Sequence, residues 1–464
     1  MFRFMPLFSI STEEIGVQGN KYSPNRQIFC HRPQVSSLLA LHKTRNVNLT
    51  PTTFTSDFLM QVKATSRLFR IYEQTMAQKP ILISGAGLAS LLLARSLLRS
   101  HIPFQIFERD ASLSFRGQGC RLRMSREGLD AIESVLDPPS FKRFYDTCGK
   151  TGGSGFVALD ALTAEVTEED MRLGSRDGKI VGIARGEMRR LFLEGCEDFV
   201  HFNTHVTGYE LTNDGVRAVF ADGSKSVEGS LLVAGDGLKS TIAKKVSGGL
   251  LKVYDLGARG IHGQAPTTAF KPLGEGVFRV VDDVNPDGRL YIITNVRPND
   301  MDDPRVEFGW TMVGVPGVIK APNDDYSIVG KTTADIAKSL TTDWNPRFKP
   351  LFDEMNELEA AFWKITCSTP TGVPEWPNVP RVTVIGDAAH SMTPVGGIGA
   401  NTAVRDSALL GGLLRDAGGY ADGLTAAYEK GMRVYASEAV KTSYGQATKA
   451  FNVQISDSTP TVGE

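Results

Sequence analysis

Short apolar runs followed by glycine-rich turns recur along this chain, and the first of them predicts a βαβ unit. Residues 80–84 (PILIS) form an apolar run that predicts a buried strand, and residues 86–100 place apolar side chains at helical spacing. Residues 104–108 (FQIFE) predict a second strand, which ends in Glu108. The order strand, helix, strand predicts two parallel strands that lie in one sheet.

Two later segments repeat this change from an apolar strand to a polar turn. The alternation over residues 206–234 predicts a β-meander whose last strand leads into GDGLKS at 235–240. The apolar run at 382–385 is followed by Asp387, and the glycine-rich loop at 396–399 precedes a helical pattern. Both segments are predicted to deliver polar side chains to the ends of buried strands.

A third pattern predicts a separate sheet in the middle of the chain. Residues 276–283, 289–296 and 305–315 are rich in β-branched and aromatic side chains, which is typical of strands. The patterns together predict four segments, which are an N-terminal extension at 1–75, the first part of a nucleotide-binding domain at 76–250, a substrate-domain sheet at 251–369, and the rest of the binding domain with C-terminal helices at 370–464.

The first 75 residues differ from the rest of the chain. They show no clear periodicity, carry more basic than acidic side chains, and are rich in Ser, Thr and Asn. This profile is compatible with a mitochondrial presequence, and equally with a disordered tail or an upstream stretch before Met76. We expect residues 1–75 to be mostly disordered and to take no part in the chemistry.

Composition excludes several classes of partner. The 51 basic and 52 acidic side chains give a net charge of -1, so no strong field would attract nucleic acid or an anionic membrane. The five cysteines contain no CxxC pair, which argues against a zinc site, and we expect no bound metal. No apolar stretch reaches the roughly 20 residues of a membrane span. We therefore expect a cytoplasmic protein, or a mitochondrial one if the leader is a presequence.

The residues of the first turn fit the recognition of a dinucleotide. Gly85 permits a sharp turn, Gly87 lets the backbone approach a pyrophosphate, and the helix N-terminus offers positive potential to the phosphates. Glu108 follows Gly85 at nearly the spacing at which a carboxylate meets a ribose hydroxyl. Asp236 and Asp387 stand at the ends of the later strands, where ligands of open α/β sheets gather. These residues alone do not divide FAD from NAD.

The order of the motifs resembles a known enzyme family. From residue 80 to residue 414 it resembles the FAD-dependent monooxygenases of the aromatic-ring-hydroxylase type, which are single-component flavoproteins similar to para-hydroxybenzoate hydroxylase. Two departures are the order Ala-Gly-Asp-Gly, where the family usually has Gly-Ala-Asp-Gly, and Ile398, where Gln is frequent. The motifs that carry the resemblance are the turn GAGLAS, Glu108, RGQGCRLRMSREG, ARGEMRRLF, AGDG, and the GD motif with its loop GGIGAN.

The resemblance implies a fold and a chemistry. The fold would be α/β, with a Rossmann-like FAD-binding domain, an inserted mixed or antiparallel β-sheet substrate domain, and C-terminal helices. The cofactor would be FAD, with NAD(P)H as co-substrate and O2 as oxidant. A flavin C4a-hydroperoxide would then hydroxylate or epoxidise a small aromatic or polycyclic substrate. Such a protein would act as a monomer or a homodimer, with these small molecules as its partners.

The resemblance also implies roles for individual residues. Glu108 would bind the adenosine ribose, Gly119 would lie against the FAD, and Arg185 would contact the ribityl-pyrophosphate region. Asp387 would accept from a ribityl hydroxyl, and Gly399 and Ala400 would approach the isoalloxazine. His390 belongs to the common GDAAH pattern, so we expect it to support the loop rather than to act as a base.

Two residues of the predicted sheet are candidates for the substrate site. Arg279 and Tyr291 flank a turn and resemble the Arg and Tyr that urate-hydroxylating relatives place near substrate and flavin. An Arg could hold an anionic group, and a Tyr could orient a phenol or a carbonyl. The alternative is a solvent-facing Arg and a half-buried strand Tyr, because a slip of one residue would move either side chain to the other face.

Other functions are compatible with the same motifs. A flavin-dependent oxidoreductase of this fold that does not insert oxygen is one, although the tryptophans do not form the Trp-x-Trp-x-Ile-Pro pattern of halogenases. A non-catalytic flavin-binding redox sensor is another. The patterns do not select the substrate, and NADPH and NADH are not distinguished.

Overall fold

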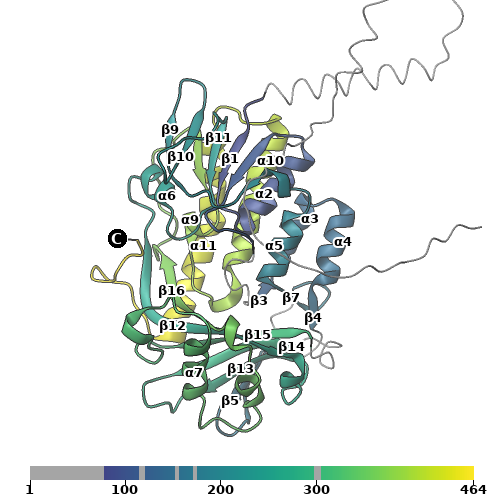
Figure 1. Cartoon of the computed structure of the whole chain (residues 1–464), viewed down its shortest axis with the longest axis vertical. Helices are drawn as coiled ribbons and strands as arrows, with labels where there is room; N and C mark the ends of the chain where they lie inside the picture. The colour runs from purple at the N-terminus through teal and green to yellow at the C-terminus, as the bar shows by residue number, and fades with distance from the viewer. Residues whose placement is uncertain (1–77, 114–120, 152–155, 171–174, 297–304, 464) are drawn as a thin grey trace, which may run out of the picture. The chain divides into compact units, whose positions relative to one another are not determined.

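A parallel sheet forms the first layer of the structure (Figure 1). The computed structural model describes residues 78–113, 121–151, 156–170, 175–296 and 305–463. The central strand of the parallel sheet is the predicted apolar run after residue 80, and its four side chains are all buried. The strands lie in the order β17-β11-β1-β2-β8, with bounds β1 (Ile81–Ser84), β2 (Phe104–Phe107), β8 (Val200–His201), β11 (Leu231–Ala234) and β17 (Val382–Val384).

Helices and two small sheets surround this layer. Helix α2 follows β1, and its apolar side chains fill the main core together with those of α10. The small sheets have the orders β3-β7-β4 and β10-β9. The helices are α2 (Leu88–Arg99), α3 (Arg126–Val135), α4 (Pro138–Thr147), α5 (Arg185–Leu193), α6 (Thr241–Val246), α9 (Asp387–His390), α10 (Gly399–Ala417) and α11 (Leu424–Phe451). The small-sheet strands are β3 (Arg121–Met124), β4 (Gly149–Thr151), β7 (Ile180–Ala184), β9 (Val206–Leu211) and β10 (Val216–Phe220).

A second layer is a mixed sheet of seven strands. Its order is β16-β12-β15-β14-β13-β5-β6, and only β5 runs parallel to its neighbour β13. The strands are β5 (Phe156–Asp160), β6 (Val166–Asp170), β12 (Val253–Pro266), β13 (Gly276–Asp282), β14 (Leu290–Val296), β15 (Glu307–Gly314) and β16 (Ala361–Ser368). The remaining elements are the helices α7 (Lys331–Leu340) and α8 (Pro350–Asp353) and the short 3-10 turns η3 (Glu197–Phe199), η4 (Thr267–Phe270), η5 (Pro322–Asp324), η6 (Glu357–Glu359) and η7 (Val395–Gly397).

The two faces of the mixed sheet have different neighbours. Side chains such as Phe308, Trp310 and Met312 point to the face that α7 and α8 cover. Side chains at alternate positions, including Tyr291 and Val313, pack on α11 and on the loop after β17. The second face is therefore the one turned toward the loops of the parallel sheet.

The predicted fold class is confirmed. A parallel sheet, a mixed sheet and C-terminal helices are present, and the strand patterns at 276–283, 289–296 and 305–315 correspond to β13, β14 and β15. Strands β5 and β6 join the mixed sheet from within residues 76–250, which the pattern did not indicate.

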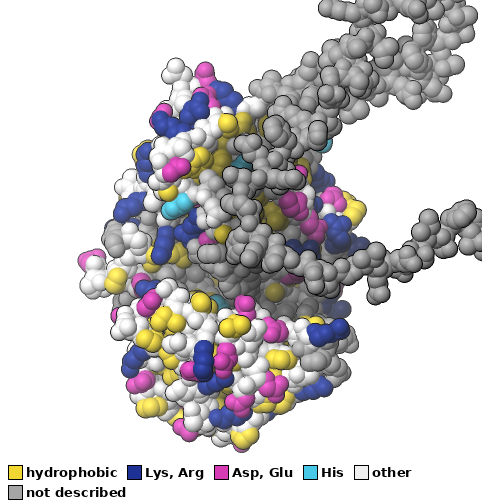
Figure 2. All heavy atoms as spheres, in the orientation of Figure 1, with side chains coloured by type: hydrophobic (Ala, Val, Ile, Leu, Met, Phe, Trp, Pro, Cys, Tyr) yellow, Lys and Arg dark blue, Asp and Glu magenta, His cyan; other side chains and the backbone are white. Residues whose placement is uncertain are grey.

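The surface charge and the apolarity of the helices agree with what the composition predicts. Figure 2 shows basic and acidic side chains interspersed over the described part of the face in view, without a large area of one sign. Among the helices that the structure describes, none combines the length and the apolarity that a membrane crossing requires.

Helix α2 lies close to the turn that follows β11 at the end of the parallel sheet. Ser90 lies in α2 and is fully buried, and its hydroxyl has no hydrogen-bond partner among the described residues. A Cβ placed on Gly235 would lie 2.2 Å from Ser90 Oγ and 3.1 Å from Ile385 Cγ1. In the AGDG motif, Gly235 stands where the family usually has Ala. The Ser90 side chain occupies the space that the methyl group of this Ala would need.

We expect Gly235→Ala to destabilise the fold by about 1–3 kcal/mol, because the added methyl group overpacks a filled site. The same change in a Ser90→Ala background should cost less, since the clashing oxygen is gone. Equilibrium urea unfolding of the four proteins in a double-mutant cycle measures the coupling. Equal costs in both backgrounds would show that the two positions are independent.

Candidate functional site

The carboxyl ends of three neighbouring strands lie side by side. Ser84 of β1 pairs with Ala234 of β11, and Ala234 pairs with Val384 of β17. The chain therefore leaves all three strands from one row, and the predicted turns after them meet at one edge of the sheet (Figure 1). This edge is where ligands of parallel sheets bind.

The two glycines of the first turn have different surroundings. Gly85 has φ +87, and a Cβ there would lie 2.7 Å from Gly235 O and 2.8 Å from Asp236 Cα. Gly87 has φ -73, and the nearest described atom to its Cβ would be Gly235 O at an ordinary 3.5 Å. The fold itself thus requires glycine at 85, whereas at 87 the space lies open toward the sheet edge.

Glu108 holds the first turn from the end of β2. Its side chain is buried, and Oε2 accepts a hydrogen bond of 2.6 Å from the Ala86 amide. Oε1 accepts from the Asp110 amide at 2.9 Å. The carboxylate predicted to meet a ribose therefore lies directly beside the Gly-rich turn.

Arg189 is a second support of this turn that sequence reasoning missed. It is buried, Nη2 donates to Ala86 O at 3.1 Å, and Nη1 donates to Leu113 O at 2.9 Å. The predicted Arg185 is the first residue of the same helix, α5, and is half-buried. The sequence feature that could have indicated a buried Arg189 is its position beside Met188 and three residues before Phe192, because both of these apolar residues are buried on the same helix.

The second turn contributes an aspartate whose environment is unusual. Oδ1 of Asp236 is buried and meets no hydrogen-bond donor within the described ranges. Burial raises the pKa of this carboxyl, while hydrogen bonds from Ser240 and Ser84 oppose the rise. An orphaned carboxylate oxygen at a strand end is the kind of group that a ligand hydroxyl or amide satisfies.

Asp387 begins α9 directly after the third strand. Burial raises the pKa of its carboxyl, and the charges of His390 and Arg185 oppose this rise. The side chain is nevertheless exposed to water. Both observations hold if Asp387 lines an enclosed cleft, where protein atoms surround it but leave its oxygens accessible.

A buried polar cluster fixes the loop that carries Asp387. Asp406 in α10 is fully buried, and its Oδ2 lies 2.7 Å from His390 Nε2 and accepts from the Gly386 amide at 2.7 Å. Its Oδ1 accepts from the Tyr435 hydroxyl at 2.7 Å. His390 therefore faces Asp406 in the protein interior, in the position of a loop support.

The glycine-rich loop before α10 is clamped by Asn401. Its Nδ2 donates to Gly397 O at 2.8 Å and to Arg123 O at 2.9 Å, and its Oδ1 accepts from the Ser125 amide at 2.8 Å. The helix begins at Gly399 and Ala400 without a side-chain cap from any residue that the structure describes. Its first amide groups remain available for an acceptor on a ligand. Gly119 lies outside the described residues.

Arg279 and Tyr291 point to the same face of the mixed sheet. Arg279 pairs with Ile293 in the register and Tyr291 pairs with Val281, so the two side chains are diagonal neighbours on one face of adjacent strands. Arg279 forms an ion pair of 2.8 Å with Glu168. The Tyr291 ring is buried and stacks on Phe451 at 6.1 Å, and burial raises the pKa of its hydroxyl.

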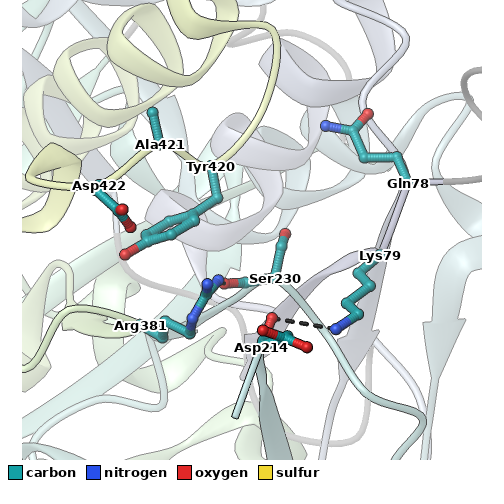
Figure 3. Close-up of a pocket in the computed structure, with 8 residues that line it drawn as sticks. All are labelled: Gln78, Lys79, Asp214, Ser230, Arg381, Tyr420, Ala421 and Asp422. Atoms are coloured by element: carbon teal, nitrogen blue, oxygen red, sulfur yellow. Dashed lines mark hydrogen bonds between the residues drawn. The ribbon is translucent and has the colours of Figure 1, made fainter. Parts of the chain in front are cut away.

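A separate surface pocket lies at the opposite edge of the parallel sheet (Figure 3). Lys79 lies two residues before β1, and Ser230 and Arg381 immediately precede β11 and β17, so the pocket opens at the amino ends of the strands. It has a volume of about 410 Å³ and is open to solvent. The Arg381 guanidinium lies 4.6 Å from the centre of the Tyr420 ring, and Lys79 Nζ donates to Asp214 O at 3.1 Å. None of the predicted site residues lines this pocket.

Comparison with known proteins relates this chain to proteins that bind FAD. A profile of the FAD binding domain family matches residues 372–443, which include Asp387 and the glycine-rich loop. The chain is 28% identical over 372 residues to the dual O-methyltransferase/FAD-dependent monooxygenase elcB of Phaeosphaeria nodorum, and the match covers 72% of this chain and 40% of that protein. It is 26% identical to the FAD-dependent monooxygenase thnD of Trichoderma harzianum, over 72% of this chain and 82% of the relative. The chain is therefore similar to FAD-dependent monooxygenases over about 72% of its length.

A solved structure has the same fold. HpxO of Klebsiella pneumoniae, whose structure is described as complexed with FAD and uric acid, superposes with a TM-score of 0.65 at 21% identity. The superposition covers 80% of this chain and 89% of HpxO. The chain spans about two fifths of the length of elcB, which also carries a methyltransferase in its name.

The residues at the carboxyl edge fit FAD. The open space at Gly87 and the uncapped start of α2 suit a pyrophosphate, and the orphaned Asp236 oxygen and the accessible Asp387 suit hydroxyl donors. Within the described ranges, no group of three or more His, Cys, Asp and Glu side chains is arranged to hold a metal ion.

The contrast between the two glycines predicts different phenotypes. We expect Gly85→Ala to impair folding, because it forces a Cβ at positive φ into the backbone of the second turn. Gly87→Ala should change the free energy of unfolding by about 1 kcal/mol or less and yet weaken FAD binding, because the methyl group enters the space for the pyrophosphate. Urea unfolding of the apoproteins and FAD titration measure the two effects. Tight FAD binding by Gly87→Ala would contradict this assignment.

The His390–Asp406 pair predicts a pH-dependent stability. Burial lowers the pKa of His390, but the charge of Asp406, its hydrogen bond and the charge of Asp387 together raise the pKa by more, so the net shift is upward from 6.5. The contribution of the protonated ring is therefore fully present below about pH 6.5 and lost as the pH rises through the folded-state value.

We expect His390→Gln to lower the free energy of unfolding more at about pH 6 than at about pH 9. Urea unfolding at both pH values measures the difference, and the exposed His205→Gln serves as the matched control. A loss that is independent of pH would show that the pair is not charged in the folded protein.

Proposed function

We propose that this protein is a monooxygenase that uses FAD, NAD(P)H and O2 to hydroxylate or epoxidise a small aromatic or polycyclic substrate. The observation that carries the proposal is the row of strand ends at Ser84, Ala234 and Val384, which brings the Gly-rich turn, Asp236 and Asp387 to one edge. The mixed sheet turns one face toward the loops of this edge. The substrate would lie against this face, beside the cofactor.

The residues of the chain would hold the cofactor and shield it. Bound FAD would supply the redox chemistry, taking electrons from NAD(P)H and using them to activate O2. Glu108 would bind the adenosine ribose, Arg185 the ribityl-pyrophosphate region, and Asp387 a ribityl hydroxyl. The uncapped amides at Gly399 and Ala400 would offer positive potential to negative charge on the ring system.

The sheet face would hold the substrate. Arg279 stays a candidate for binding an anionic group of the substrate, and its ion pair with Glu168 holds the guanidinium at this face. Tyr291 stays a candidate for orienting the substrate, although its ring also packs on Phe451. The names of elcB and thnD, which both include an FAD-dependent monooxygenase, support oxygen insertion over a redox sensor without turnover.

The purified protein should carry FAD, and Asp387→Ala should lose most of it. Loss of a hydrogen bond to a charged acceptor costs about 1.5–3 kcal/mol, which is roughly a 10- to 150-fold weaker affinity. Asp416→Ala is the matched control, because Asp416 is exposed near the end of α10. FAD titration of both variants, with near-ultraviolet circular dichroism to verify folding, measures the effect, and unchanged affinity in Asp387→Ala would remove this residue from the site.

Isotopically labelled O2 tests the reaction class. In the presence of NADPH and an accepted aromatic compound, one labelled oxygen atom should appear in the product. NADPH oxidation that releases only hydrogen peroxide with every compound of an aromatic panel would favour an oxidoreductase without oxygen insertion. A flavin-loaded protein that never oxidises NADPH or NADH would favour a redox sensor.

A further inference from the structure

One register row crosses the mixed sheet from a histidine to an ion pair. His262 on β12 pairs with Thr311 on β15, and Thr311 pairs with Ile293 on β14. Ile293 pairs with Arg279 on β13, and Arg279 lies opposite Ala158, which pairs with Glu168. Residues in one row of paired strands share a face, so these side chains form a continuous strip.

This strip lies on the face that meets the FAD-binding loops. The neighbouring positions Tyr291 and Val313 pack with Met392 and Val395, which belong to the loop between Asp387 and α10. The charge of Arg185 acts on both Asp387 and His262, which places the histidine near the cofactor edge.

The middle of the strip is apolar and exposed. Ile293 is 39% exposed, which is unusual for a large aliphatic side chain in the interior of a sheet. Its neighbours in the row are polar on both sides, with Thr311 on one side and Arg279 on the other. An exposed apolar floor between two polar ends fits a ligand that is apolar in the middle and polar at its ends.

An aromatic wall stands at the His262 end. The His262 and Trp363 rings stack with centroids 4.9 Å apart and planes inclined by 13°. A Cβ on Gly260 would lie 2.0 Å from Trp363 Nε1, so glycine at 260 lets the indole lie flat on β12. Both rings are half-buried, and Trp363 Nε1 has no hydrogen-bond partner in the part of the chain that the structure describes. The stack of His262 and Trp363 is therefore already formed in the structure, and part of the surface of both rings stays accessible.

The polar partner of His262 is defined. Nδ1 lies 3.0 Å from Thr311 Oγ1, which orients the ring and leaves Nε2 for another group. Burial and the charge of Arg185 lower the pKa of His262 to about 4, so the ring is neutral near pH 7. A neutral imidazole can accept a hydrogen bond from a phenol.

We propose that this strip is the floor of the substrate site and that His262 positions a hydroxyl group of a planar polycyclic substrate. The proposal rests on the proposed function. The substrate would lie over Ile293, with its hydroxyl at Nε2 of His262 and an anionic or carbonyl oxygen at Arg279. Three strand spacings separate the backbones of His262 and Arg279 by about 14 Å, a span that the two long side chains shorten to the length of two or three fused rings.

Binding of a two-ended probe to the oxidised holoenzyme tests the proposal. The probe is a naphthoic acid with a hydroxyl group at the opposite end of the ring system, and its methyl ether lacks only the hydroxyl donor. Isothermal titration calorimetry without NADPH should show the hydroxyl compound binding about threefold to tenfold more tightly than the ether, which is the worth of one hydrogen bond.

Variants assign the two ends separately. His262→Phe keeps an aromatic ring on Trp363 and should reduce the hydroxyl-to-ether ratio to about one, with the affinity for the ether retained. Thr311→Val should lower the ratio partly. Arg279→Gln should weaken both compounds and leave the ratio unchanged. His205→Phe, an exposed histidine outside the mixed sheet, is the matched control and should behave as wild type.

The outcomes separate this inference from the proposed function. Equal binding of the two compounds by the wild type, failure of both to bind, or an unchanged ratio in His262→Phe would overturn the assignment of His262, even in a protein that holds FAD and inserts oxygen. The expected ratios in a protein that never incorporates labelled oxygen would instead support the strip and refute the monooxygenase.

Discussion

The alignment of three strand ends is the constraint on which the rest of the structure depends. Because Ser84, Ala234 and Val384 lie in one row, the turns that follow them compete for the same space. The conflict is resolved by absent side chains, since the backbone of Gly235 occupies the place of a Cβ on Gly85, and Ser90 occupies the place of a Cβ on Gly235. Each turn is therefore shaped by its neighbour.

Helix α11 extends this constraint to the second layer. Its residues Tyr435 and Phe451 lie about four and a half turns apart. The Tyr435 hydroxyl donates to Asp406 beneath the loop that carries Asp387, and the Phe451 ring stacks on Tyr291 of the mixed sheet. One continuous helix thus contacts both layers. A rigid element of this kind sets the separation between a flavin and the sheet face that would carry a substrate.

Much of this arrangement could be predicted from sequence, and the exceptions have physical causes. Strands β1, β2, β11 and β17 of the parallel sheet and strands β13–β15 were predicted because each is a short apolar or β-branched run. Strand β8 was not predicted, because it is only two residues long. Strand β12 was not singled out, because the glycines at 257, 260 and 263 interrupt its apolar pattern, and a register shift lies between Asp255 and Arg259. The insertion of β5 between β13 and β6 depends on contacts distant in sequence, which no local pattern reports. His262 belongs to no motif, so only the register gives it neighbours.

Arg185 shows how the two layers are coupled by charge. Burial raises the pKa of Asp387, and the charge of Arg185 opposes this rise. Burial also lowers the pKa of His262, and the charge of Arg185 adds to that lowering. Negative charge bound beside Arg185 would offset both effects. An anionic group bound beside Arg185 would therefore raise the proton affinity of His262 on the mixed sheet. Coupling of this kind needs only proximity and low dielectric, and both follow from the packing of the sheet face against the cofactor loops.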